Sequence, residues 1–518
     1  MNRRQMLQLS MTAAAAAVAP AIAEAEQRST VSGKVEQWNM HEITLHGPTD
    51  GNPFLDVTLT ATFSLDHRNV DVTGFYDGNG LYRIRFMPDT PGHWTWRTAS
   101  SSTALANQTG SFDCTPATGN NHGPVNVAHQ FHFQHADGTP YFPFGTTCYA
   151  CAFMGSPWEE QTIATLRSTG FNKVRLCLMP KGQPHPLFAL PFVQKPDGTN
   201  DLARLDPTYF QHVEKTIATL SSLNIQADLI LFHPYDSWGF KSMPREADDL
   251  YLRYAIARLA AYRNIWWSVA NEYDLVKTKT MPDWDHFFKV IQQCDPYSHL
   301  RSIHHSGVRY DNSKPWVTHA SLQEYDFEKS AEFRAAWNKP IIYDEIQYEG
   351  NISRRWGNLS AEEMTRRFWL AIINGTYATH GETFISPPGT PVWSDGGKLI
   401  GTSAARIAFL RSVVEKITHT GLNQYEGAYY LSAGKPNEVY LYYFDTHSLG
   451  DYDFPLPEGV HFKCTLIDPW NMTTNELPGT FTGKPAHVKG APRDKTEDSP
   501  SYIKLASKPY MAALFQKV

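Results

Sequence analysis

Two glutamates close two similar stretches of the sequence, and together they have the chemistry of an acid/base and a nucleophile. The stretch 264–270 is mostly apolar and leads into Asn271 and Glu272, and the stretch 339–343 leads into Asp344 and Glu345. Short apolar runs rich in aromatic and β-branched residues are typical of strands covered on both faces. Barrel enzymes keep their reacting groups at the carboxyl ends of such strands, so we expect both glutamates at one barrel mouth.

Side chains alternate along a strand, which predicts which residues share a face. The first stretch places Glu272 on the same face as the side chains at 266, 268 and 270. The second places Glu345 on the same face as Tyr343, with Asp344 pointing the other way.

The elements that would position these residues are repeated β-then-α units over about 280 residues, a length typical of a TIM barrel. We expect helices at 158–168, 207–223 and 361–373. Eight strands are predicted at residues 141–148, 172–178, 225–232, 264–272, 302–305, 317–322, 339–346 and 377–384.

The barrel is predicted to lie between two all-β domains. Short alternating runs separated by Gly and Pro turns fill the residues before 122, and similar runs return after 417. The expected class is a multidomain α/β plus β protein. Its predicted parts are a signal peptide at 1–25, an immunoglobulin-like β-sandwich at 28–122, a (β/α)8 barrel at 123–416 and a small β-sandwich at 417–518.

The Asn-Glu pair at the end of one strand and the later strand-end Glu resemble clan A of the glycoside hydrolases. In that clan the first glutamate ends strand four and is the acid/base, and the second ends strand seven and is the nucleophile. The resemblance implies these roles for Glu272 and Glu345. The text Gly170-Phe-Asn-Lys-Val-Arg-Leu176 is similar to the clan's strand two, which implies that Arg175 steadies the nucleophile.

The resemblance extends over nearly all of the chain that follows the predicted signal peptide. The segments 74–86 and 91–96 are similar to the immunoglobulin-like domain that precedes many sugar-cleaving barrels. The order of sandwich, barrel and sandwich resembles relatives of cellulases and of apiosidase-like enzymes.

The implied activity is a retaining glycoside hydrolase that cleaves an oligo- or polysaccharide by double displacement. Retention needs the two carboxyl groups about 5–5.5 Å apart. Glu272 has to be protonated before the reaction, and Glu345 has to be ionised, with donors or a cation nearby. Asn271 is expected to donate to a hydroxyl beside the anomeric carbon.

Further substrate-binding candidates lie near the predicted strand ends. Aromatic rings offer apolar faces to sugars, and Trp393 follows strand eight, where related enzymes place a stacking indole. We expect no cofactor and no metal. The candidates are His233, Tyr235, Trp238, His305, Gln323, Tyr325 and Trp393.

Two other classes of protein remain as alternatives. Five histidines near strand ends (233, 304, 305, 319 and 380) would suit a metal-dependent barrel hydrolase, although no His-x-His motif stands on strand one and no H-E-x-x-H motif is found. The second alternative is an exported carbohydrate-binding protein without activity, and the presence of both glutamates argues against it.

The net charge of the chain indicates which partners it can bind, and its amino-terminal segment indicates where in the cell it acts. The formal net charge is −6 and no basic tract is present, which excludes nucleic acid as an expected partner. Arg3 and Arg4 precede an Ala-rich apolar run with small residues for cleavage near Ala23, and the pair resembles a twin-arginine signal. We therefore expect export to the periplasm or beyond in a bacterium, with no membrane attachment after cleavage.

Overall fold

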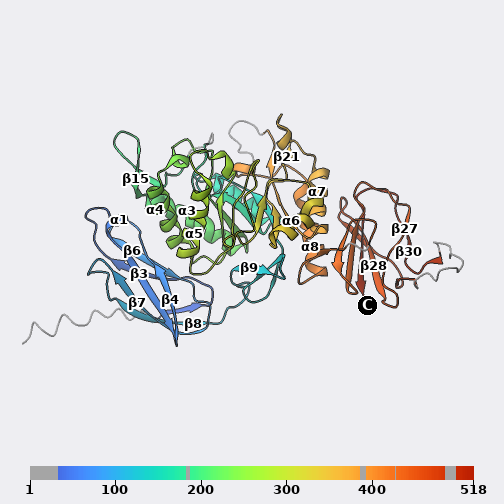
Figure 1. Cartoon of the computed structure of the whole chain (residues 1–518), viewed down its shortest axis with the longest axis horizontal. Coiled ribbons are helices and arrows are strands. Elements are labelled where there is room, and N and C mark those ends of the chain that lie inside the picture. The colour runs from blue at the N-terminus through green and yellow to red at the C-terminus, as the bar shows by residue number, and fades with distance from the viewer. Residues whose placement is uncertain (1–32, 183–186, 386–392, 426–427, 485–497) are drawn as a thin grey trace, which may run out of the picture.

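The chain forms a central barrel between two β-rich domains, as the sequence predicts (Figure 1). The computed structural model describes residues 33–182, 187–385, 393–425, 428–484 and 498–518. The predicted signal peptide lies outside these residues. None of the helices in the described ranges is long and apolar enough to cross a membrane.

The amino-terminal domain is a sandwich of two sheets, with strand orders β1-β8-β7-β3-β4 and β2-β6-β5. Every second side chain of its strands points inward and forms the core. Leu59, Ala61 and Phe63 of β3 are buried in this way, and they share the core with Trp94. Its elements are β1 (Gly33–Glu36), β2 (His41–His46), α1 (Pro53–Asp56), β3 (Leu59–Leu65), β4 (Arg68–Thr73), β5 (Phe75–Tyr76), β6 (Leu81–Phe86), β7 (Gly92–Ser100) and β8 (Thr109–Thr115).

The barrel contains all eight predicted strands, in the order β18-β17-β16-β13-β12-β22-β20-β19. Neighbouring strands in this order are parallel. The barrel closes between β18 and β19, the first and last strands of the order, where the Thr318 amide donates to the Arg301 carbonyl at 2.9 Å. The strands are β12 (Phe144–Thr147), β13 (Lys173–Cys177), β16 (Gln226–Phe232), β17 (Ile265–Ala270), β18 (Arg301–Ser302), β19 (Ala320–Leu322), β20 (Ile341–Tyr343) and β22 (Tyr377–His380).

Helices surround the barrel, and the three that the sequence predicts are among them. Each predicted helix differs from the observed one by at most one residue at its carboxyl end. The α-helices are α2 (Trp158–Arg167), α3 (Pro207–Ser222), α4 (Arg245–Leu259), α5 (Met281–Cys294), α6 (Ser330–Trp337), α7 (Ala361–Ile373) and α8 (Ser403–Ile417). Short 3-10 helices are η1 (Phe240–Ser242), η2 (Tyr273–Leu275), η3 (Phe327–Lys329), η4 (Arg355–Gly357) and η5 (Trp393–Asp395).

Small strands decorate both ends of the barrel. A three-stranded antiparallel sheet under the barrel brings Phe133 against Trp266, whose indole fills the barrel floor. At the mouth, β21 and β23 form a parallel pair. These strands are β9 (Val125–Ala128), β10 (His132–His135), β11 (Pro140–Tyr141), β14 (Phe192–Gln194), β15 (Asn200–Leu205), β21 (Glu349–Gly350) and β23 (Glu382–Thr383).

The carboxyl-terminal domain places a six-stranded sheet against the barrel helices. Leu441 and Tyr443 face the barrel core, whereas Tyr440 and Tyr442 face a second core inside the domain, which explains why this strand is buried on both faces. The ring of Tyr443 stacks on Trp369 of α7. Its strands are β24 (Asn423–Gln424), β25 (Ser432–Lys435), β26 (Val439–Tyr443), β27 (Asp451–Asp453), β28 (Phe462–Asp468), β29 (Thr473–Glu476), β30 (Tyr502–Lys504) and β31 (Ala512–Lys517).

Candidate active site

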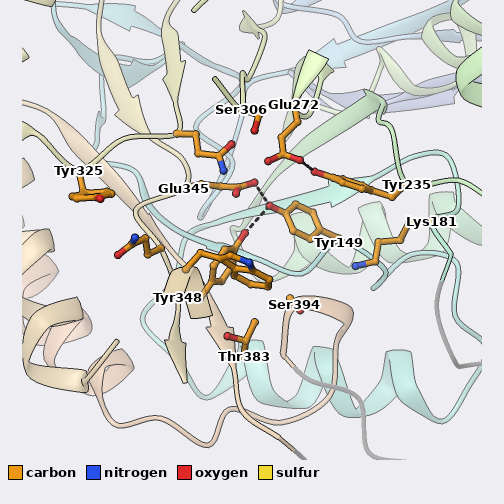
Figure 2. Close-up of a pocket in the computed structure, with 13 residues that line it drawn as sticks. Tyr149, Lys181, Tyr235, Glu272, Ser306, Tyr325, Glu345, Tyr348, Thr383 and Ser394 are labelled. Atoms are coloured by element: carbon orange, nitrogen blue, oxygen red, sulfur yellow. Dashed lines mark hydrogen bonds between the residues drawn. The ribbon is translucent and has the colours of Figure 1, made fainter. Parts of the chain in front are cut away.

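A cavity of about 480 Å³ opens at the carboxyl ends of the barrel strands, and both predicted catalytic glutamates line it (Figure 2). Its volume falls within the range of about 300–1,000 Å³ that is usual for small-molecule sites. The lining residues are Tyr149, Lys181, Tyr235, Glu272, Ser306, Gln323, Tyr325, Glu345, Gln347, Tyr348, Trp356, Thr383 and Ser394.

Glu345 follows β20 and is almost completely buried, with one of its oxygens held by two donors. Oε1 accepts a hydrogen bond from the Tyr149 hydroxyl at 2.5 Å and another from Asn271 Nδ2 at 3.2 Å. Burial raises the pKa of Glu345, Arg175 opposes that rise and the charge of Glu272 adds to it. The two hydrogen bonds also favour the ionised form, which is the form a nucleophile needs.

Arg175 lies on β13 inside the barrel, and it reaches Glu345 less directly than we expected. Its Nη1 is 3.9 Å from Glu345 Oε1, which is too long for a hydrogen bond. Its Nη2 donates to Asn271 Oδ1 at 2.9 Å. The guanidinium is fully buried, with Asp228 at 3.5 Å and Asp344 at 3.9 Å. Arg175 therefore supplies a nearby positive charge, and its hydrogen bond acts through Asn271.

Asn271 connects the two sides of the cavity. Its Nδ2 donates to Glu345 and also to the Tyr235 hydroxyl at 3.2 Å. An amide nitrogen carries two protons, so both are used in this structure. A direct hydrogen bond from Asn271 to a sugar hydroxyl stays a prediction, and it would have to replace one of these contacts.

Glu272 lies two residues beyond the end of β17, in the left-handed backbone region, with φ 45°. A residue other than glycine is seldom found in this conformation, and such strain collects at functional sites. Its Oε2 accepts a hydrogen bond from the Tyr235 hydroxyl. Figure 2 shows the carboxyl groups of Glu272 and Glu345 on facing sides of the same space, with Tyr149 beneath Glu345.

The expected alternation fails at the end of β20. Tyr343 packs outward, where its hydroxyl meets Ser330 of α6. Asp344 points into the barrel interior, because its oxygens bind Lys173 at 2.7 Å and Ser321 at 2.6 Å. The strand ends at Tyr343, so the turn after it, and not strand alternation, carries Glu345 into the cavity.

Four of the other predicted binding residues do not line the cavity. His233 donates through Nε2 to the Met179 carbonyl and accepts from the Tyr235 amide, so it supports the backbone that carries Tyr235. His305 lies 3.3 Å from Glu324. Trp238 stacks towards Phe240, and Trp393 is only 1% exposed and donates its indole N–H to Thr146 at 2.7 Å. In this structure the buried Trp393 has no open face for a sugar.

The remaining candidates do line the cavity, together with residues that the sequence analysis missed. Gln323 and Tyr325 follow β19, and Tyr325 is 47% exposed while Arg367 covers one face of its ring. Tyr149 and Tyr348, whose hydroxyls are 2.9 Å apart, were missed. Tyr149 stands two residues after β12, a strand end that the sequence itself marks. Also missed were Lys181, Ser306, Gln347, Trp356, Thr383 and Ser394.

A family model matches the part of the chain that forms the barrel. Residues 128–395, which contain both glutamates and the barrel strands, match the model described as "Apiosidase-like, catalytic domain". The chain belongs to the apiosidase-like family. In this apiosidase-like protein, residues 34–101 also match a domain of unknown function, DUF5060, and residues 429–516 match another, DUF5605. Among curated proteins, none matches the chain.

Solved structures of glycoside hydrolases are similar to the apiosidase-like protein. A candidate glycoside hydrolase from Bacteroides vulgatus ATCC 8482 is 37% identical, with a TM-score of 0.86, and the match covers 94% of this chain and 100% of that one. A family 5 glycoside hydrolase from the same organism has a TM-score of 0.58 at 14% identity, covering 76% of this chain and 94% of that one. Another glycoside hydrolase has a TM-score of 0.56, also at 14% identity, covering 76% and 97%. The last two show the fold.

The histidines considered for a metal-dependent hydrolase do not converge in the apiosidase-like barrel. His233 and His305 have the contacts given above. His304 and His319 lie fully buried in the barrel interior, where burial lowers the pKa of His319 to about 3. In the described ranges, none of the five histidines lines the cavity that contains Glu272 and Glu345.

Proposed function

We propose that this protein is a retaining glycosidase in which Glu345 is the nucleophile and Glu272 is the acid/base. The observation that carries the proposal is the difference between the two carboxyl groups in one cavity. Glu345 is buried and receives two hydrogen bonds on Oε1, while Glu272 is half-buried and receives one from Tyr235. Two similar groups can perform different steps only when their surroundings differ.

The first step forms a covalent glycosyl-enzyme. Both side-chain hydrogen bonds that Glu345 accepts from the described residues fall on its Oε1, so Oε2 attacks the anomeric carbon. The bond from that carbon to the leaving oxygen breaks, and Glu272 donates its proton to this oxygen. Arg175 and the donors on Oε1 stabilise the carboxylate until its charge is consumed by the new bond.

The second step releases the sugar. Glu272, now ionised, takes a proton from water, and the water oxygen attacks the anomeric carbon. The bond to Glu345 Oε2 breaks, and the configuration of the anomeric carbon is retained. The Tyr235 hydroxyl, which donates to Glu272 Oε2, orients this carboxyl group for the step.

The two glutamates are distinguished by variants assayed on a panel of aryl glycosides and oligosaccharides, including apiosides because of the family's name. Glu345→Ala should lose at least about 10³-fold in kcat on every substrate, because no other group forms the intermediate. Glu272→Ala should retain activity on aryl glycosides whose leaving group needs no proton, and azide should restore its turnover by attacking the glycosyl-enzyme.

The control is Glu328→Gln, which changes an exposed glutamate outside the cavity and should leave kcat unchanged. Proton NMR of the first product should show the substrate's anomeric configuration. An inverted first product would reject double displacement, and equal loss in both alanine variants on activated substrates would reject the division of roles. Activity that survives loss of both glutamates would point to another chemistry.

We also propose that the protein acts on saccharides outside the cytoplasm. The support is the amino-terminal pattern of Arg3 and Arg4 followed by an Ala-rich run. Fractionation of bacteria that express the full chain should find the protein in the periplasm or medium, with a new amino terminus near Ala23. Retention of the intact protein in the cytoplasm would reject export, and blockage by Arg3→Lys with Arg4→Lys would identify the twin-arginine route.

A further inference from the structure

Two glutamates and a histidine meet behind the wall of the catalytic cavity. Glu349 lies on β21, Glu382 lies opposite it on β23, and His380 ends β22. All three side chains are buried, and one potential ligand atom from each lies within 4.8 Å of the others. None of the three lines the cavity in which Glu272 and Glu345 lie.

Neither glutamate forms an ion pair with Lys or Arg in the described ranges, and His380, 3.9 Å from Glu349, is the basic side chain of the cluster. Glu349 accepts from the amides of Thr402 and Ser403, at 2.9 and 3.3 Å. Glu382 accepts from those of Ile400 and Gly401, at 2.5 and 2.9 Å.

These donors surround the first turn of α8 and carry only the partial positive charge of a helix amino terminus. Two buried carboxylates ordinarily need a fuller counter-charge.

The histidine supplies an independent observation, because it directs an unpartnered nitrogen at the carboxylates. Its Nδ1 lies 3.1 Å from Thr146 Oγ1, which also accepts from the Trp393 indole. Its Nε2 has no hydrogen-bond partner among the residues that the structure describes, although the side chain is fully buried. Nε2 is 3.9 Å from Glu349 Oε2, a separation that suits two ligands of one ion better than a hydrogen bond.

We propose that Glu349, His380 and Glu382 bind one divalent cation that accepts both nitrogen and carboxylate ligands, Zn²⁺ or Mn²⁺. Ligand atoms lie about 2.0–2.2 Å from such an ion, so two on opposite sides are about 4.0–4.4 Å apart and neighbouring ones are closer. The three atoms of the cluster, within 4.8 Å of one another, reach these separations after small side-chain movements. Glu349 Oε2 already accepts from the amide and the hydroxyl of Ser403. Glu349 Oε1 and both oxygens of Glu382 accept one hydrogen bond each, so each of these three oxygens keeps a lone pair for the ion. An imidazole with two carboxylates favours Zn²⁺ or Mn²⁺ over Ca²⁺.

The bound cation is structural and holds the cavity wall in place. Tyr348 and Thr383 line the cavity, and each is the immediate neighbour of a ligand, Glu349 or Glu382. The Tyr348 hydroxyl bonds to that of Tyr149, which donates to Glu345. The ion therefore links β21, β23 and the start of α8 behind the nucleophile, and it takes no part in the bond changes of glycoside cleavage.

The test is metal binding by the full chain, purified without a histidine tag and treated with EDTA. Dialysis against Zn²⁺ or Mn²⁺ in separate arms, followed by elemental analysis, should leave about one ion per chain in at least one arm. The same metal should raise the melting temperature by at least about 2 °C. Both measurements are independent of substrate, so they stand even if the proposed glycosidase activity is wrong.

Variants assign the ion to these residues. Glu382→Gln and His380→Asn should each lose the bound ion and the thermal shift. The matched control is Glu159→Gln, which alters a half-buried Glu-His pair with His212 on α2 and α3 and should keep both. No retained ion and no thermal shift in the unaltered protein in either arm would overturn the proposal, whatever the variants do. Equal binding by Glu382→Gln and the unaltered protein would also overturn it.

Discussion

Asn271 is the residue on which the two catalytic candidates depend. It receives a hydrogen bond from the buried Arg175 and donates to both Glu345 and Tyr235, and Tyr235 in turn donates to Glu272. A single amide thus relates the orientation of Glu345, the proposed nucleophile, to that of Glu272, the proposed acid/base. This explains physically why an asparagine precedes the glutamate: a shorter or apolar side chain would leave Arg175 and Glu345 without their shared partner.

Tyr149→Phe should move the acidic limb of the pH profile of kcat/KM to higher pH. Glu345 must be ionised to attack, so activity is lost as the pH falls through its pKa, which burial already raises. The Tyr149 hydroxyl donates to the ionised carboxylate, and losing this donor raises the pKa further. The measurement is kcat/KM against pH for both proteins.

The matched control for this variant is Tyr310→Phe, which removes a tyrosine hydrogen bond to Asp285 away from the cavity and should leave the acidic limb in place. A limb that stays unchanged, or moves to lower pH, in Tyr149→Phe would show that Tyr149 does not stabilise the ionised nucleophile.

Among the elements, α3 and α4 have two functions: they cover the barrel and they receive the amino-terminal sandwich. Arg258 of α4 pairs with Asp77 at 2.6 Å and with Glu214 of α3 at 2.7 Å. Arg85 of β6 makes two hydrogen bonds to the same Glu214, at 2.7 and 3.0 Å. These buried charges are paired across the boundary between the two domains. If the domains separated, each would expose charged side chains that have lost their partners.

Arg258→Met should destabilise the protein by about 3 kcal/mol, because it leaves buried carboxylates with fewer partners. The free energy of unfolding, measured by urea titration, checks this value. Arg253→Met on the exposed side of the same helix is the control and should change it by less than about 0.5 kcal/mol. Equal effects of the two substitutions would mean that the buried network does not hold the domains together.

At the scale of the whole molecule, the carboxyl-terminal sheet is part of the barrel's packing. Leu441 and Leu514 belong to the same core as Phe368 and Ile372 of α7. Figure 1 shows this domain beside α7 and α8, with the amino-terminal sandwich beneath α3, α4 and α5. Neither flanking domain contributes a residue to the cavity, which is lined by residues of the barrel domain.

Leu441→Ala should lower the stability of the barrel as well as that of the carboxyl-terminal domain, by about 2–5 kcal/mol for the lost packing. Thermal unfolding followed by near-ultraviolet circular dichroism and by residual activity should shift together to lower temperature. Thr474→Ala, on the exposed edge strand β29, should shift neither. Activity that survives to the original temperature while the spectrum shifts would show that the domain unfolds independently.

The sequence by itself determined the elements and the pair of strand-end glutamates. Apolar runs, alternation and helical periodicity are local properties, and they located the eight barrel strands, the helices α2, α3 and α7 and the two β-rich flanks. The order of Asn271, Glu272 and Glu345 also predicted the glycoside hydrolase class. The division of labour between the two glutamates remains a prediction until the variants are assayed.

Only the tertiary structure decided what surrounds those glutamates, because side chains from distant strands meet only when the barrel closes. It brought Tyr149, which follows the first strand, to Glu345, and it placed Asn271 between Arg175 and Glu345. It buried Trp393, since the indole finds its hydrogen-bond partner in Thr146 across the barrel. Strand alternation could not orient Glu345, because β20 ends at Tyr343 and the backbone turns before the cavity.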